Sequence, residues 1–123
     1  MVHIFGYALG EFGATEQQIK DAVAREFQDD RIFEYKVLAV WSSEPDYSMS
    51  CWMLLEKDGT MYEVTGGHCS CAGYEEQFSP AECPAEYLTS SKSSWELDRV
   101  KESSSELWAS LLHSLGLQPR MEA

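Results

Sequence analysis

The sequence predicts an α+β domain, in which an antiparallel sheet of three or four strands is packed by a helix from the N-terminal third and by a C-terminal helix. Two observations predict this fold. Three β-rich segments follow one another through short turns in the middle of the chain, and apolar residues recur with helical spacing on either side of them. The chain has 123 residues, which is enough for one modest core, so we expect a single domain covering residues 1–123.

The first predicted helix spans Glu16–Gln28. Thr15 and Gln18 fit a capping box at its start. An apolar residue recurs every four positions along it, namely Ile19, Val23 and Phe27. This spacing places the three side chains on one face of the helix, which is therefore predicted to pack on the sheet.

The C-terminal helix is predicted to begin at Trp95 or at Ser103, with Glu106 as the capping partner of Ser103. Its apolar stripe consists of Leu107, Trp108, Leu111, Leu112 and Leu115. Gly116 followed by Pro119 is a typical helix end.

The middle of the chain predicts an antiparallel meander. Its three strands are Ile32–Trp41, Tyr47–Glu56 and Met61–Val64. Asp58 and Gly59 give the second connection the sequence of a tight hairpin turn. The β-formers in Met1–Gly10 predict an edge strand or an extended arm, and Pro80 predicts a short helical turn over Ser79–Glu82.

The four tryptophans, Trp41, Trp52, Trp95 and Trp108, are predicted to pack in the core, although tryptophan also anchors interfaces. No stretch approaches the roughly 20 apolar residues that span a bilayer, and the start of the chain lacks the features of a secretory signal. We therefore expect a cytosolic protein. In that reducing compartment the four cysteines are expected as free thiols or metal ligands rather than as disulfides.

The chain is strongly acidic, with 21 Asp and Glu against 9 Lys and Arg and a net charge of −12. Residues 37–91 hold nine of the acids and one base, Lys57. Direct binding to nucleic acid is disfavoured, because phosphates have the same sign. The carboxylates are predicted either to meet a basic surface of another macromolecule or to serve solubility alone. The candidate partner-binding residues are Glu44, Asp46, Glu56, Asp58, Glu63, Glu75 and Glu76.

A dense group of reactive residues follows the third predicted strand. Together with a later cysteine it supplies four candidate zinc ligands, which are His68, Cys69, Cys71 and Cys83. The spacing is unlike that of common zinc motifs. His68 and Cys69 are adjacent, and only one residue separates Cys69 from Cys71. We therefore expect no cofactor, with zinc as the alternative.

The same group allows two further interpretations. Cys69 or Cys71 is a candidate nucleophile, with His68 or His113 as the base and Glu75 or Glu76 as the orienting group. Such a nucleophile needs a lowered thiol pKa, whereas the acidic surroundings raise it. In the other interpretation the segment is a compact cap on the sheet edge. Its glycines then permit tight turns, and Glu75 or Gln77 hydrogen-bonds backbone amides.

One pattern in the middle of the chain has the character of a family signature. Its elements are Asp46-Tyr47-Ser48, residues 55–59, Tyr62-Glu63-Val64, His68-Cys69-Ser70-Cys71, Gly73, Glu75, Gln77 and Pro80. On these residues the stretch Asp46–Glu82 resembles a group of small bacteriophage and bacterial proteins with a His-Cys-Ser-Cys motif. The resemblance implies a phage-type context and no catalytic activity, and Cys83 has no counterpart in that pattern.

Charge and resemblance together predict a small acidic phage-type accessory protein, which binds and inhibits a basic host protein or a nucleic-acid-handling complex of the CRISPR-Cas or restriction type. An enzyme is less expected. The alternatives are a thiol or zinc enzyme centred on the His-Cys-Ser-Cys segment, and a structural domain that forms a homodimer through the stripe from Leu107 to Leu115.

Overall fold

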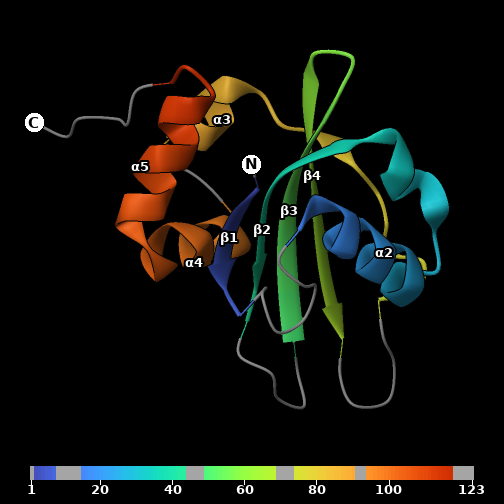
Figure 1. Ribbon diagram of the computed structural model, residues 1–123. Coiled ribbons are helices and arrows are strands. Elements are labelled where there is room, and N and C mark those ends of the chain that lie inside the picture. Colours follow the sequence, from blue (N-terminus) through green and yellow to red (C-terminus); the bar gives the residue numbers. More distant parts are fainter. Residues whose placement is uncertain (1, 8–14, 44–48, 69–73, 91–93, 118–123) are drawn as a thin grey trace, which may run out of the picture.

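The computed structural model describes residues 2–7, 15–43, 49–68, 74–90 and 94–117 (Figure 1). Its strands are β1 (His3–Gly6), β2 (Lys36–Ser42), β3 (Met49–Lys57), β4 (Thr60–His68) and β5 (Ala81–Glu82). Its helices are α2 (Glu16–Phe27), the 3₁₀ helix η1 (Asp30–Glu34), α3 (Ala85–Thr89), α4 (Trp95–Ser103) and α5 (Ser105–Ser114).

The five strands form one sheet in the order β1-β2-β3-β4-β5, and helices cover both of its faces (Figure 1). Helix α2 packs on one face, while α3, α4 and α5 pack on the other. The predicted α+β class is confirmed. The sheet is wider than predicted, because a strand is added at each edge of the central meander.

The antiparallel meander of β2, β3 and β4 is confirmed. Asp58 (φ +53°) and Gly59 (φ +82°) form the β3–β4 hairpin turn, where both positions need a left-handed backbone. Because both faces of the sheet are covered, β3 is buried along most of its length. Its side chains alternate between two cores: Cys51, Met53 and Leu55 on the α2 side, and Trp52 and Leu54 on the other side.

The N-terminal strand requires a correction to the antiparallel sheet. β1 is an edge strand, which was one of the two sequence expectations for Met1–Gly10. It pairs parallel to β2, however, with His3 opposite Ala39 and Gly6 opposite Ser42. The chain between the two strands passes through α2, so β1, α2 and β2 form a β-α-β unit. The sheet is consequently mixed.

The predicted start of the second strand was wrong. Residues from Ile32 onwards were expected in a strand, but Asp30–Glu34 form η1 and β2 begins at Lys36. Asp29 caps η1 by accepting a hydrogen bond from the backbone N–H of Arg31 at 2.9 Å. This local bond competes with strand pairing, and Ile32 is buried in the α2-side core from the 3₁₀ helix.

Two predictions around β4 also need correction. β4 continues past Val64 to His68, because β3 supplies a pairing residue for every position. The helical turn predicted at Ser79–Glu82 is absent, and Ala81–Glu82 form β5, which pairs with Tyr62 and Glu63 of β4. The open backbone groups at the edge of β4 account for this strand pairing.

The C-terminal region forms two helices rather than one. Ser104 separates α4 from α5 and caps α5, because its hydroxyl accepts a hydrogen bond from the Leu107 N–H at 3.2 Å. The predicted cap at Ser103 was one residue too early. Three residues of the predicted apolar stripe on α5 are buried against the sheet: Trp108, Leu111 and Leu112 are at most 9% exposed.

Three of the four tryptophans are core residues as predicted, namely Trp41, Trp52 and Trp108. Trp95 is 56% exposed, so the core prediction was wrong for this residue. Within the described part of the chain, no helix has the length and apolar character needed to cross a membrane.

Candidate functional site

The segment of residues 74–78 packs against α2 and closes the α2-side core. The buried ring of Tyr74 stacks on Phe27, the last residue of α2, with ring centroids 4.9 Å apart and planes 8° from parallel. Phe78 meets the same Phe27 ring edge-on at 6.1 Å. Tyr74 and Phe78 therefore pack on the C-terminal end of a helix that lies about 50 residues earlier in the sequence.

Gln77 fastens this segment to β4. Its side-chain Oε1 accepts a hydrogen bond from the Gly67 N–H, and its Nε2 donates to the Gly67 carbonyl, both at 2.8 Å. The amide therefore pairs with Gly67 as a neighbouring strand residue does. One sequence interpretation was a compact cap on the sheet edge, in which Glu75 or Gln77 forms hydrogen bonds with backbone amides. The contact between Gln77 and Gly67 agrees with that interpretation for the residues that the structure describes.

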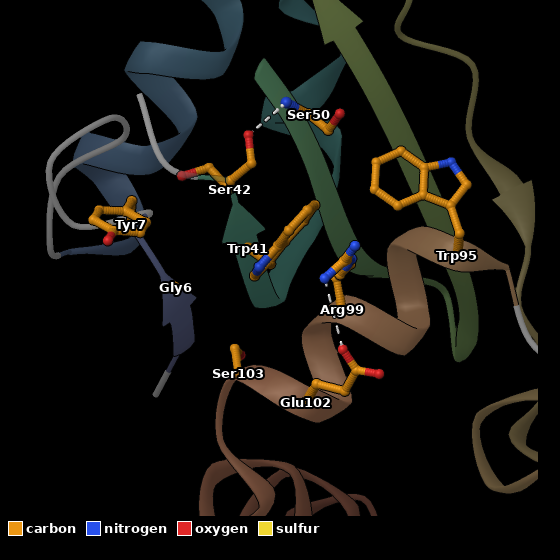
Figure 2. Close-up of a pocket in the computed structure, with 10 residues that line it drawn as sticks. Gly6, Tyr7, Trp41, Ser42, Ser50, Trp95, Arg99, Glu102 and Ser103 are labelled. Atoms are coloured by element: carbon orange, nitrogen blue, oxygen red, sulfur yellow. Dashed lines mark hydrogen bonds and ion pairs between the residues drawn. The ribbon is translucent and has the colours of Figure 1, made fainter. Parts of the chain in front are cut away.

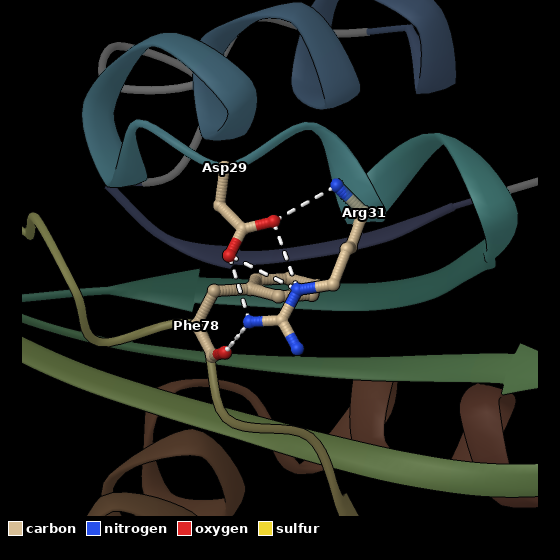
Figure 3. Close-up of polar contacts among 3 residues, drawn as sticks. All are labelled: Asp29, Arg31 and Phe78. Carbon is tan, nitrogen blue, oxygen red and sulfur yellow. Dashed lines mark hydrogen bonds and ion pairs between the residues drawn. The ribbon is translucent and has the colours of Figure 1, made fainter.

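Arg31 fastens the other end of the segment (Figure 3). Its Nη2 donates to the Phe78 carbonyl at 2.6 Å, and its guanidinium lies 5.3 Å from the centroid of the Phe78 ring. Nη2 also contacts Asp29 Oδ2 at 2.7 Å. Hydrogen bonding to Arg31 lowers the pKa of Asp29, and the same bond raises the pKa of Arg31. The charge of Arg31 is therefore already matched by a carboxylate.

These contacts gather acidic residues at one end of the molecule. Segment 74–78 brings its carboxylates beside the C-terminal end of α2 and η1. We define the acidic end as Glu26, Asp29, Asp30, Glu75 and Glu76. Its two basic neighbours are paired within it, Arg25 with Glu26 at 3.5 Å and Arg31 with Asp29. Asp30, Glu75 and Glu76 are exposed and have no ion pair among the described residues.

The remaining predicted carboxylates lie elsewhere. Glu56 and Asp58 are at the β3–β4 hairpin, at the opposite end of the sheet from Gly67 (Figure 1). Glu34, the last residue of η1, pairs with Lys57 of this hairpin at 2.9 Å, so Glu56 and Asp58 lie near the end of η1 that is farther from Asp30. Glu44 and Asp46 fall outside the described residues.

Glu63 has a structural partner. Its Oε2 accepts a hydrogen bond from the indole Nε1–H of Trp52 at 3.0 Å, and Trp52 is fully buried. A carboxylate in this position satisfies the only polar group of a core tryptophan. Of the five predicted carboxylates that the structure describes, Glu75 and Glu76 are therefore the two brought together at the acidic end. The sequence did not indicate Asp30 as a partner-binding residue, because Asp30 lies before residues 37–91, the acidic segment from which the candidates were taken.

The candidate zinc ligands are only partly covered by the structure. Cys69, Cys71 and the side chain of His68 lie outside the described residues, so zinc binding by these three stays a prediction. Cys83 is 1% exposed, and its N–H donates to the Met61 carbonyl at 2.9 Å. Met61 and His68 stand seven residues apart on β4, about 23 Å at the strand rise. The structure therefore does not bring Cys83 to His68.

The candidate nucleophiles Cys69 and Cys71 lie outside the described residues, so the thiol chemistry stays a prediction. Burial raises the pKa of the Cys83 thiol to about 12, with a further contribution from the negative charge of Glu63. His113 is exposed on α5, which covers the sheet face opposite to the side where Glu75 and Glu76 lie. No group of three or more potential metal ligands occurs in the described part of the chain.

A cavity of about 500 Å³ lies on the far side of the sheet from the acidic end (Figure 2). The ends of β1 and β2 form one wall, and α4 forms the other. Its lining includes Tyr7, Trp41, Ser42, Trp95 and Arg99. The sequence reasoning did not find this cavity. The one available signal was Gly6, which interrupts the β-formers of the N-terminal segment.

No protein-family model, curated protein or solved structure matches the chain. The resemblance of Asp46–Glu82 to phage and bacterial proteins therefore stays a prediction.

Proposed function

We propose that this chain is a small acidic binding protein, which attaches through its acidic end to a basic surface of another protein. The observation that carries the proposal is the packing of segment 74–78 on α2. It adds Glu75 and Glu76 to the carboxylates around Asp30, while each of the nearby arginines, Arg25 and Arg31, contacts a carboxylate of the same end. Unpaired carboxylates on a chain of net charge −12 attract and orient a basic partner.

Within this proposal, the expected partner is a host complex that handles nucleic acid, of the CRISPR-Cas or restriction type. Such complexes hold DNA or RNA in positively charged channels, whose charge is complementary to that of the acidic end. A protein seated in such a channel excludes the nucleic acid and thereby inhibits the complex. The resemblance of Asp46–Glu82 to phage proteins supports the same context.

The test compares two variants of equal charge. In the acidic-end variant, Asp30, Glu75 and Glu76 are replaced by lysine. In the control variant, the exposed residues Glu82, Glu86 and Glu106, which lie outside the acidic end, are replaced by lysine. Each variant gains the same charge, so a difference in binding reports the position of the carboxylates rather than the total charge. Circular dichroism and thermal unfolding first establish that both variants are folded.

Immobilised wild-type protein is used to capture partners from a bacterial lysate, and the captured protein is then purified for titration. We expect a basic partner whose Kd rises steeply with salt, is raised about tenfold or more by the acidic-end variant, and is little changed by the control. Equal losses in both variants would contradict a role for this surface. Salt-insensitive binding, or failure to capture a basic partner, would contradict the proposal as a whole.

Inhibition is measured on the purified partner. Wild-type protein should reduce its binding or cleavage of nucleic acid, the control variant should act in the same way, and the acidic-end variant should not. Binding without any effect on nucleic acid would keep the binding function and reject the inhibitor role.

A further inference from the structure

The cavity beside α4 occupies a position where ligands commonly bind. β1 and β2 run parallel, so their carboxyl ends meet at one edge of the sheet. Gly6 and Ser42 are the last residues of these strands, and both line the cavity. In sheets with parallel strands, ligands tend to bind outside the carboxyl ends, and about 500 Å³ is in the range of small-molecule sites.

The wall formed by β1 depends on Gly6. This residue has φ +61°, and a Cβ on it would lie 2.6 Å from the Ser42 carbonyl oxygen and 2.9 Å from Cδ1 of Trp41. Glycine thus allows β1 to turn directly over the end of β2. The next residue, Tyr7, donates its N–H to the same Ser42 carbonyl at 3.2 Å, which places its side chain beside the cavity.

Aromatic side chains are exposed at this cavity. Tyr7 is 51% exposed and Trp95 is 56% exposed, more than the other exposed large hydrophobic residues among those described, and both line the cavity. Trp41, which is 5% exposed, lines it from β2. An exposed indole offers a flat apolar face on which a planar ring can stack.

The cavity has one hydroxyl with a free donor hydrogen at the end of β2. Ser43 Oγ accepts a hydrogen bond from the Ser50 N–H at 2.9 Å, so its own hydroxyl hydrogen is available for an acceptor oxygen of a ligand. Ser42 also lines the cavity, but it pairs with Cys51 of the α2-side core, so its hydroxyl lies on the other face of the sheet.

Arg99 supplies a positive charge next to the exposed indole. It stands four residues after Trp95 on α4, so the two side chains share a helix face (Figure 2). Its ion pair with Glu102 is long, at 3.9 Å, and the two side chains are 65% and 70% exposed. Such a pair is weak, so the guanidinium remains able to bind a ligand anion.

We propose that this cavity binds a small planar aromatic molecule with an anionic group. The ring stacks on Trp95, and the anion binds Arg99 and the hydroxyl of Ser43. Carboxylate and phosphate groups both accept hydrogen bonds from an arginine and a hydroxyl. The two candidate ligands are therefore an aromatic carboxylate and a nucleoside monophosphate. The site is separate from the acidic end, because the two lie on opposite faces of the sheet.

The test titrates the full chain with two probes, indole-3-acetate and adenosine monophosphate. Binding is followed by tryptophan fluorescence and by the NMR signal of the Trp95 indole N–H. We expect one probe to bind with a Kd below about 10 mM and to shift the Trp95 signal, and its uncharged analogue, indole or adenosine, to bind about tenfold more weakly. The probe that binds identifies the source of the anion.

Matched variants locate the site. Arg99→Gln and Trp95→Ala should each raise the Kd about tenfold. Arg25→Gln and Phe33→Ala are the controls, because Arg25 is a similarly exposed, ion-paired arginine and Phe33 is 47% exposed, and neither lines the cavity. Both controls should leave the Kd within about twofold of wild type.

Ser43→Ala provides a second measurement. It removes the hydroxyl that can donate to the anion, so the probe should bind more weakly, and circular dichroism checks that the variant stays folded after losing the bond to the Ser50 N–H. The proposal is overturned if neither probe shifts the Trp95 signal at about 10 mM, or if Arg99→Gln and Ser43→Ala both leave the Kd unchanged.

Discussion

Gly66 has no side chain, and the ring of Tyr74 lies too close to admit a Cβ without a shift. A Cβ at this position would stand 2.9 Å from Cδ1 of Tyr74 and 3.3 Å from Sγ of Cys51. Both neighbours are buried. Gly66→Ala should therefore lower the free energy of unfolding by about 1–3 kcal/mol, as overpacking in a core does. Urea unfolding followed by fluorescence measures the change.

The adjacent glycine is the matched control. At Gly67 a Cβ would find its nearest neighbour, the Met49 carbonyl oxygen, at 3.6 Å, which is ordinary van der Waals contact. Gly67→Ala should change the free energy of unfolding by less than about 1 kcal/mol. Similar losses in both variants would show that Tyr74 does not lie against β4 as described.

The buried thiol of Cys83 should make stability depend on alkaline pH. Desolvation raises its pKa from 9.0 to about 12 in the folded protein, with a further contribution from Glu63. As the pH rises, the unfolded chain loses this proton first. The stability that the thiol contributes is therefore complete below about pH 9 and is lost progressively toward about pH 12.

Cys83→Ala removes this titration. We expect the free energy of unfolding of wild type to fall more steeply between about pH 9 and about pH 11 than that of the variant, because the other titrating groups are common to both. Denaturant unfolding at several pH values gives the two slopes. Identical slopes would mean that the Cys83 thiol is accessible to water.

Glu63 shows why individual carboxylates were assigned incompletely from sequence. Its charge made it a candidate for partner binding, but its hydrogen bond goes to the buried indole of Trp52. The two residues lie on neighbouring strands and are 11 positions apart. Which side chain meets another across a sheet depends on strand register, and no pattern within either strand indicates this particular pair.

At the level of elements, Ser104 holds the junction between α4 and α5. Its hydroxyl accepts the hydrogen bond that caps α5, and Trp108, Leu111 and Leu112 of that helix are buried against the sheet. Ser104→Ala should lower the free energy of unfolding by about 1 kcal/mol, a typical cost for loss of an N-cap. Ser105→Ala, one residue later at an exposed position, is the control and should have little effect. If both variants lose the same stability, the cap is not at Ser104.

The elements predicted best are those with local signals. The capping box of Thr15 and Gln18 is present, and α2 starts where it indicates. The Asp58-Gly59 turn likewise fixed the β3–β4 hairpin. The features that were missed depend on distant partners: the parallel pairing of β1 with β2 across the whole of α2, and β5, which forms on an edge of β4. Their sequences contain no signal of that pairing.

For the molecule as a whole, the sequence gives the total charge but not its distribution. Asp30 and Glu75 belong to the same end because Tyr74 stacks on Phe27 and Arg31 reaches the carbonyl of Phe78, 47 positions away. The cavity is also built from distant segments, since Gly6, Ser42 and Arg99 meet only in the folded chain. The sequence therefore indicated Glu75 and Glu76 as partner-binding residues, but it did not indicate that Asp30 joins them or that the cavity exists.

The distribution of apolar residues predicts a monomer. The stripe proposed for a homodimer is used within the chain, because Trp108, Leu111 and Leu112 pack against the sheet and only Leu107 is substantially exposed, at 37%. Two copies of net charge −12 also repel each other, most strongly at low salt. Light scattering should therefore give the mass of one chain, 13.9 kDa, at both low and high salt.

Leu107→Ser tests the stripe directly. Since this side chain is the exposed member of the stripe, the substitution should leave both the mass and the thermal unfolding midpoint nearly unchanged. A dimer in wild type that Leu107→Ser dissociates would restore the self-association hypothesis. A dimer that appears only at high salt and persists in this variant would instead point to an interface elsewhere, held apart at low salt by the repulsion between carboxylates.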